Sequence, residues 1–152
     1  MMRKALSLVV LILVVALAAC TGGKQAEAPV GGIPEGAALK ITGKVANEIG
    51  WIEADVKAMD TTDAEYTNKD GETKSYTGVA LKALLEKAQP AADAATLVMV
   101  ADDGYTGEVA LSEVLACDTC IVSFREQGGF STVLPGFPGN VQVKGVVELQ
   151  IK

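Results

Sequence analysis

Histidine is absent from this chain of 152 residues. Histidine is the usual general acid or base near neutral pH, and it completes both Ser-His-Asp and Cys-His nucleophilic arrangements. It is also a common ligand of zinc, copper and haem iron. Its absence excludes histidine-based catalysis, His-ligated haem and most zinc or copper sites, so any catalysis would have to come from carboxylates, from thiols or from a cofactor.

Basic residues are scarce as well. The chain has 13 lysines and arginines against 19 aspartates and glutamates, and it contains no Lys/Arg cluster. Loss of an N-terminal signal that includes Arg3 and Lys4 would leave 11 against 19, a formal charge of −8. Such a chain repels phosphate backbones and anionic headgroups. We therefore expect neither nucleic-acid binding nor broad docking on an anionic membrane.

Long hydrophobic runs are missing except at the N-terminus, where Ala5 to Ala19 is almost unbroken. This run follows Arg3 and Lys4 and ends in small residues, which is the pattern of a secretory signal peptide. It has 15 residues, whereas a helix needs about 20 to cross a hydrocarbon core. The run therefore favours a cleaved signal over a permanent membrane span.

The end of this run, Leu17-Ala18-Ala19-Cys20, resembles the lipobox of bacterial lipoproteins. The resemblance implies cleavage before Cys20, a thioether-linked diacylglycerol on its sulfur and acylation of the new amino terminus. Two or more acyl chains anchor a protein stably, whereas one holds it weakly. We expect a signal peptide at 1–19 and a lipid anchor on the extracytoplasmic face of the cell membrane, or on the outer membrane where the cell has one. An ordinary signal peptide and a short membrane anchor are the alternatives.

Residues 20–38 carry the lipidated N-terminus and have glycine, alanine and proline without a hydrophobic period, which predicts a flexible tether. Residues 39–152 form one predicted domain. Apolar alternation and dense apolar runs predict strands, and helical spacing predicts short helices. The predicted strands are 39–45, 64–67, 73–76, 96–101, 105–111, 121–124 and 141–151, and the predicted helices are 52–59, 80–88 and 112–116, the last capped by Ser112. These elements predict an α+β fold, mainly β, with a sandwich-like or barrel-like mixed sheet and two or three short helices.

Cys117 and Cys120 form a C-x-x-C pair that follows a predicted helix and precedes a predicted strand. A thiol-exchange pair would open a helix, whose N-terminus lowers the thiol pKa. In an extracytoplasmic compartment the favoured interpretation is a structural disulfide, with thiol–disulfide exchange as the alternative. A metal site would need two further ligands of the cysteine or histidine kind, so we expect no metal.

Two loops are candidates for the rim of a ligand pocket. The acidic turn with Asp102, Asp103 and Tyr105 follows a predicted strand, which is where sheet folds place functional loops. A second, rigid loop over residues 135–139 contains Phe137, and its glycines allow close approach of a ligand. A plain turn and a rigid crossover are the alternative interpretations.

Six segments of the predicted domain form an ordered series: LKITGKV at 39–45, IEADVKAM at 52–59, YTGVAL at 76–81, VADDGY at 100–105, VLPG at 133–136 and VKGVVEL at 143–149. In order and spacing they resemble the molybdopterin-binding domain of the sulfite oxidase family. The resemblance covers Leu39 to Lys152, and it implies that domain's fold and a molybdopterin cofactor.

The resemblance also assigns roles to particular positions. The family binds molybdenum through a cysteine before the aromatic-Gly-Val segment, but Asp63 to Tyr76 contains no cysteine here. For the pterin phosphate the domain offers Arg125 and, at the Val-Lys position, Lys144. We therefore predict a cofactor-free binding or accessory protein without catalytic residues, whose partner is a small molecule or a protein. The alternative is a small molybdopterin-dependent oxidoreductase that uses Cys117 or Cys120 as the metal ligand.

Overall fold

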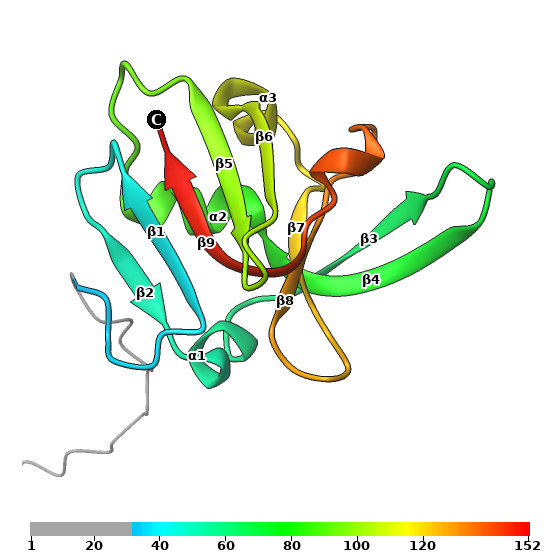
Figure 1. Ribbon diagram of the computed structural model, residues 1–152, viewed down its shortest axis with the longest axis horizontal. Helices are drawn as coiled ribbons and strands as arrows, with labels where there is room; N and C mark the ends of the chain where they lie inside the picture. Colours follow the sequence, from blue (N-terminus) through cyan, green and yellow to red (C-terminus); the bar gives the residue numbers. More distant parts are fainter. Residues whose placement is uncertain (1–31) are drawn as a thin grey trace, which may run out of the picture.

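The computed structural model describes residues 32–152, so the predicted signal peptide, Cys20 and most of the predicted tether lie outside the described residues. Nine strands form one mixed sheet, accompanied by three short helices and a 3-10 turn (Figure 1). This confirms the predicted fold class. The strands are β1 (Leu39–Gly43), β2 (Ile49–Trp51), β3 (Thr62–Thr67), β4 (Thr73–Ala80), β5 (Thr96–Ala101), β6 (Thr106–Ala110), β7 (Ile121–Phe124), β8 (Phe130–Val133) and β9 (Lys144–Ile151). The helices are α1 (Glu53–Lys57), α2 (Leu81–Ala88) and α3 (Leu111–Leu115), and the 3-10 turn is η1 (Gly139–Val141).

Strand β9 connects the parts of the sheet. The main strand order is β2-β1-β9-β8-β7-β4-β3, and β5 joins β9 to β6. The second half of β9 pairs with β1 in parallel, its first half pairs with β8, and β5 runs antiparallel along most of its length. Register shifts occur in both β5 and β8 where they meet the first half of β9. Such irregularities bend strands and increase their twist, and β9 curves strongly in Figure 1.

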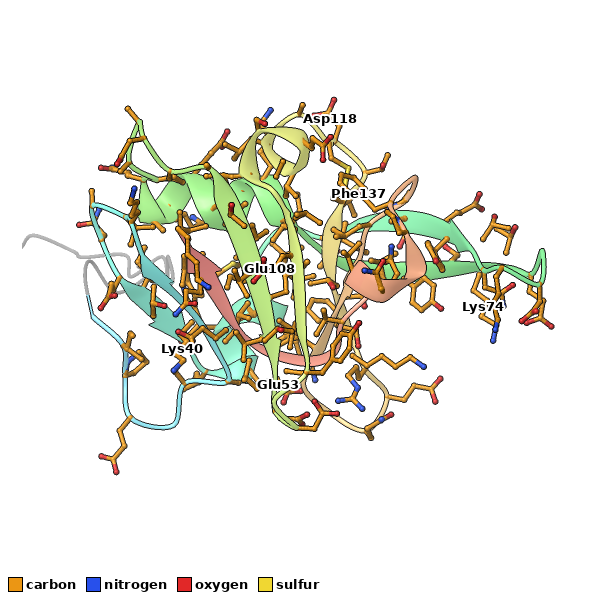
Figure 2. All side chains as sticks on the ribbon, turned by 45° about the horizontal axis from the view of Figure 1, so that its top comes forward. Lys40, Glu53, Lys74, Glu108, Asp118 and Phe137 are labelled. Carbon is orange, nitrogen blue, oxygen red and sulfur yellow. A yellow bond between two sulfur atoms is a disulfide. The ribbon has the colours of Figure 1, made fainter. Side chains whose placement is uncertain are left out.

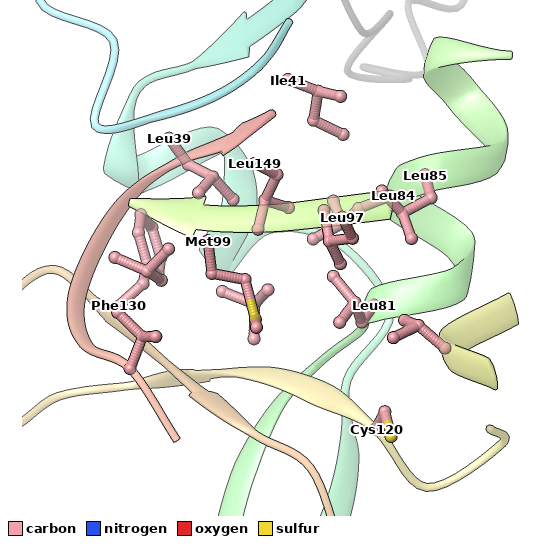
Figure 3. Packing of buried hydrophobic residues seen from close by; sticks show 14 of the residues in the cluster. Leu39, Ile41, Leu81, Leu84, Leu85, Leu97, Met99, Cys120, Phe130 and Leu149 are labelled. Carbon is pink, nitrogen blue, oxygen red and sulfur yellow. The ribbon is translucent and has the colours of Figure 1, made fainter. Parts of the chain in front are cut away.

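Helix α2 covers the apolar face of the sheet. Its leucines at 81, 84 and 85 recur at helical spacing and are fully buried, because residues three and four apart lie on one helix face. Figure 3 shows them pointing toward Leu97 of β5 and the other apolar side chains of the main core. Trp51 of β2 is also fully buried in this core, and its indole Nε1 has no hydrogen-bond partner among the described residues.

A second, smaller apolar cluster lies on the opposite face of β7. Ala64, Ile121 and Val133 are buried there, with Tyr66 and Tyr76 packed against them. Val122, the neighbour of Ile121, belongs to the main core, as the alternation of side chains along a strand requires. Each fully buried side chain of this size contributes about 1.5–3 kcal/mol, so this small cluster holds the β3–β4 hairpin far less strongly than the main core holds the rest.

The β3–β4 hairpin, called the arm below, extends beyond the rest of the sheet (Figure 1). Asp70 and Gly71 lie in the turn between β3 and β4. The side chain of Asn68 accepts the N–H groups of Asp70 at 2.9 Å and of Glu72 at 3.0 Å, and Gly71 has φ of 81°. A positive φ is readily adopted only by glycine, which explains Gly71 in this turn.

Residues 32–38, part of the predicted tether, are hydrogen-bonded to β2 and its flanks. Gly50 N–H donates to the carbonyl of Gly32 at 3.2 Å, and Ala38 N–H donates to the carbonyl of Trp51 at 2.8 Å. This part of the predicted tether is therefore hydrogen-bonded to the domain. Every helix within residues 32–152 is too short or too polar to cross a membrane.

The structure differs from the predicted elements in several places. Strand β4 continues to Ala80 rather than ending at 76, and most other bounds differ by one or two residues. Strands β2 and β8 were not predicted, and β9 begins at Lys144 rather than at 141 because η1 occupies residues 139–141. The expected Ser112 cap is wrong: α3 begins at Leu111, its N-cap is Ala110, and no side chain caps it. Ala110 is the last residue of β6, so the strand leads directly into the helix and Ser112 falls inside the first turn.

We predict that Gly78→Ala separates β4 from β7. A Cβ on Gly78 would lie 2.1 Å from the carbonyl oxygen of Val122, so the two strands must move apart. Overpacking of this kind costs about 1–3 kcal/mol or more. Urea unfolding of the full chain, followed by circular dichroism, measures the loss.

The matched control is Gly139→Ala. There the nearest atom to a new Cβ is the Tyr66 hydroxyl at 3.6 Å, an ordinary contact, and φ is not positive. Its free energy of unfolding should stay within about 0.5 kcal/mol of the wild type. Equal losses in the two variants would contradict the close β4–β7 approach.

Candidate functional site

An open cleft of about 750 Å³ lies where β4 diverges from β7. The β4–β7 ladder consists of three pairs, from Ala80–Ile121 to Gly78–Ser123. Beyond Gly78 the arm leaves the sheet, and the chain after β7 enters the β7–β8 turn. The cleft is lined by Tyr66, Asn68, Glu72, Lys74, Ser75, Tyr76, Thr77, Ser123, Phe124, Arg125, Glu126, Gln127, Ser131, Thr132, Val133, Gln142 and Lys144.

Three cations line the cleft: Lys74 from the arm, Arg125 from the β7–β8 turn and Lys144 from β9. Within residues 32–152 none of them has a carboxylate oxygen within 4 Å, whereas Lys40, Lys44, Lys57 and Lys82 each have one. Glu72 and Glu126 are the acidic lining residues. The cleft therefore carries a local positive excess on an acidic chain, and its cations are available to an anionic ligand.

Aromatic and hydroxyl groups complete the lining. Tyr66 and Tyr76 are half-buried and come from the two strands of the arm. On the floor, Ser123 Oγ donates to the carbonyl of Ser131 at 3.1 Å. Tyrosine offers both an apolar ring and a polar hydroxyl to a ligand. The cleft thus combines aromatic, hydroxyl and cationic groups, which suits a polar ligand with negative charge.

Glu53 of α1 holds the β7–β8 turn in place through a hydrogen bond to its main chain. One oxygen of its carboxylate accepts the N–H of Gly129 at 3.1 Å, and the other lies 2.6 Å from Lys57 Nζ. The hydrogen bond from Lys57 and the one from Gly129 hold the pKa of Glu53 below its ordinary value. This interaction positions the turn that carries Arg125 beside the cleft.

The predicted pocket residues occupy two different places. Lys144 lines the cleft, whereas Asp102, Asp103, Tyr105 and Phe137 do not. Asp103 Oδ1 accepts the N–H of Tyr105 at 2.9 Å, which makes a local turn, and the Tyr105 hydroxyl donates to the carbonyl of Asn140 at 2.6 Å.

Asp102 and Phe137 also have structural surroundings. A Cβ on Gly145 would lie 2.6 Å from Asp102 Oδ1 and 3.2 Å from Arg125 Nη1, so Asp102 lies next to the cleft arginine. Phe137 packs against the main core.

The two predicted disulfide cysteines are joined. Cys117 and Cys120 form a disulfide with a Cα–Cα distance of 5.5 Å, between α3 and β7. Cys120 is fully buried. Asp118, between the two cysteines, and Glu53, which holds the β7–β8 turn, lie at opposite ends of the domain in Figure 2.

A molybdopterin cofactor bound through a thiolate does not fit this cleft. Its lining contains no cysteine, and both cysteines of the described residues are in the disulfide. Nor do residues 32–152 contain a group of three or more Cys, Asp or Glu side chains placed to hold a metal ion. A disulfide sulfur is not the thiolate that ligates a metal.

The fold is similar to that of a solved enzyme, the sulfane dehydrogenase SoxCD from Paracoccus pantotrophus. The TM-score is 0.62 at 21% sequence identity, and the match covers 74% of this chain and 37% of that one. This chain therefore corresponds to little more than a third of that enzyme's chain, and at this identity the likeness establishes the fold alone. No family model and no curated protein matches the sequence.

We predict that Glu53→Gln destabilises the protein in a pH-dependent way. Because the folded-state pKa of Glu53 is lowered, its carboxylate adds stability above the unfolded pKa, and this stability is lost as the pH falls through the folded pKa. The difference in unfolding free energy between wild type and variant should be full at neutral pH and shrink below pH 4.5, the ordinary value for this group. Urea unfolding of the full chain at a series of pH values measures it.

The control for this series is Glu126→Gln on the same turn. Glu126 is exposed and makes no ion pair or side-chain hydrogen bond with the described residues. The Glu126→Gln variant should therefore have nearly the same free energy of unfolding as the wild type at every pH. A loss in Glu53→Gln that stays constant from neutral to acid pH would refute the role of the carboxylate charge.

Proposed function

We propose that this chain is a lipid-anchored, extracytoplasmic binding or accessory protein whose ligand occupies the cleft between the arm and the β7–β8 turn. The observation that carries the proposal is the cleft itself, which presents beside two tyrosines three cations that have no carboxylate partner within residues 32–152. Clefts of about 300–1,000 Å³ are typical of small-ligand and cofactor sites. The cleft lining contains neither histidine nor cysteine, which favours binding over catalysis.

In this proposal the domain works without molybdopterin. The fold is shared with an oxidoreductase, but fold alone does not carry chemistry. The thiols that would serve the alternative, a small molybdopterin-dependent oxidoreductase, are joined to each other at Cys117 and Cys120.

The lipid anchor at Cys20 would keep the domain at the membrane surface. Eleven residues separate Cys20 from Gly32, and a chain of that length spans at most about 40 Å. This reach would allow the cleft to meet ligands near the membrane without inserting into it.

We predict that Cys20→Ser abolishes lipidation. Cells grown with radiolabelled palmitate should label the wild type and leave the variant unlabelled, because the acceptor sulfur is gone. The matched control is the Cys117→Ala/Cys120→Ala double variant, which should keep its label. Label on Cys20→Ser, or loss of label from the double variant, would rule out Cys20 as the acceptor.

The cofactor-free state is tested on the full chain purified from its native membrane in detergent. Elemental analysis should find molybdenum far below one atom per chain. Stoichiometric molybdenum would overturn the proposal in favour of the oxidoreductase.

The position of the ligand site is tested with a photo-crosslinking amino acid. Placed at Gln127 in the cleft, it should yield an adduct of discrete mass in native membranes. The same amino acid at Lys87, on α2 and outside the cleft lining, should yield none. If the crosslinker at Gln127 gave no adduct either, the cleft would not be the binding site.

A further inference from the structure

The main chain of β4 presents hydrogen-bonding groups to the cleft. In an antiparallel pair, the residues that bond to the partner strand alternate with residues whose groups face away. Asn68 N–H donates to the carbonyl of Glu72 at 2.9 Å, at the start of the β3–β4 ladder. Because Glu72 bonds to the β3 side, every second residue after it does too, so the main-chain groups of the even-numbered residues of β4 bond to β3. The N–H and C=O groups of Ser75 and Thr77 therefore face the other edge.

The far end of β4 confirms this direction. Leu81 N–H donates to the carbonyl of Cys120 at 2.9 Å, toward β7, and Leu81 follows Ser75 by six positions and Thr77 by four. The β4–β7 ladder ends with the Gly78–Ser123 pair, and in the same register Phe124, the last residue of β7, lies opposite Thr77. The part of the β4 edge without a neighbouring strand therefore begins at Ser75, next to Thr77. Both residues line the cleft. The cleft therefore has an open strand edge as one wall.

The opposite wall also carries main-chain groups. Arg125 N–H donates to the carbonyl of Gly129 at 3.1 Å, on the β8 side of the hairpin. By the same alternation, the main chain of Phe124 faces β4, opposite Thr77, at the point where the two strands separate. An extended chain lying in the cleft beyond this point would thus bond to the main chain of β4 at Ser75.

Charge distinguishes the two open edges of the arm. The outer edge, β3, carries the exposed acidic residues Asp63 and Glu65, and neither lines the cleft. The inner edge, β4, borders the cleft, where Lys74, Arg125 and Lys144 outnumber Glu72 and Glu126 and have no carboxylate partner within 4 Å among the described residues. An acidic segment would be repelled at β3 and attracted at β4.

We propose that the ligand of the cleft is an extended peptide segment with acidic side chains, which adds to the open edge of β4 as a further strand. This inference rests on the proposed function and names its ligand. Strand addition supplies affinity through main-chain hydrogen bonds and specificity through alternate side chains. Here the carboxylates pair with Lys74, Arg125 and Lys144.

The first experiment selects peptides from a random seven-residue library displayed on phage against the full chain in detergent. The selected sequences should be enriched in aspartate and glutamate relative to the unselected library. A selected peptide is then synthesised with and without N-methyl groups at alternate residues. Methylation removes main-chain donors and leaves the charge unchanged, so it should weaken binding about tenfold, the equivalent of one or two lost hydrogen bonds.

The second experiment uses matched proline variants on the two edges of the arm. Ser75→Pro removes an N–H that faces the cleft and spares the bonds to β3, so the hairpin is kept and peptide binding is lost. Glu65→Pro removes an outward N–H on the β3 edge, outside the cleft, and should bind the peptide as the wild type does. Circular dichroism checks that both variants are folded.

Three results would overturn the strand-addition proposal: selected peptides without an acidic excess, equal affinity of the N-methylated peptide, or unchanged binding by Ser75→Pro. Failure here is distinguishable from failure of the proposed function. If the crosslinker at Gln127 captures a small molecule while no peptide binds, the cleft remains the binding site and only the peptide is wrong. If Gln127 gives no adduct, the cleft itself is lost.

Discussion

The pairing of β9 with three other strands is the interaction on which the rest of the domain depends. Its parallel ladder with β1 joins segments about a hundred residues apart, and it is reinforced where Thr42 Oγ1 donates to Glu148 at 2.6 Å. Its first half holds β8, and through β8 it holds β7 and the arm. Because these contacts are long-range, the complete sheet depends on β9, whereas β3–β4, β5–β6 and β7–β8 are pairs of consecutive strands. The curvature of β9 also turns the β8–β7–β4–β3 part of the sheet away from β1 and β2.

The cleft follows from the way that part of the sheet ends. Two strands that separate leave main-chain groups without partners, and such edges are a liability that proteins usually cover or charge. Here the separation occurs after Gly78, where the close approach to Val122 leaves no space for a side chain. The arm then relies on the small cluster around Ile121 and on its own turn at Asn68. A ligand in the cleft would contact both the weakly held arm and the rest of the sheet, and so would add packing where the arm has little.

Local patterns predicted those parts of the fold that depend on local signals. Strands 96–101 and 121–124 have the predicted bounds because each is a short, dense run of apolar residues. Strand β2 has three residues, all buried, and so shows no alternation. Strand β8 contains a buried polar residue, Thr132, which breaks the apolar pattern expected of a buried strand. Its burial is possible because its hydroxyl donates to the carbonyl of Val141 and accepts the N–H of Val143. Lys144 and Arg125 were the cleft residues that the sequence indicated, whereas Ser75 takes part in the proposed site through its main chain, which side-chain identity does not reveal.

Trp51 lies at the other end of the strand order from the arm, in β2, and it is the single tryptophan of the chain. Its ring is fully buried and its Nε1 has no hydrogen-bond partner among the described residues. The tryptophan fluorescence of this protein, excited beyond the tyrosine absorption band, therefore comes from one apolar site, far from Tyr66 and Tyr76 in the order of strands. Its emission reports on the integrity of the β1–β2 edge. Exposure of the indole on unfolding shifts this emission, whereas Trp51 does not line the cleft and so is not in contact with a ligand there.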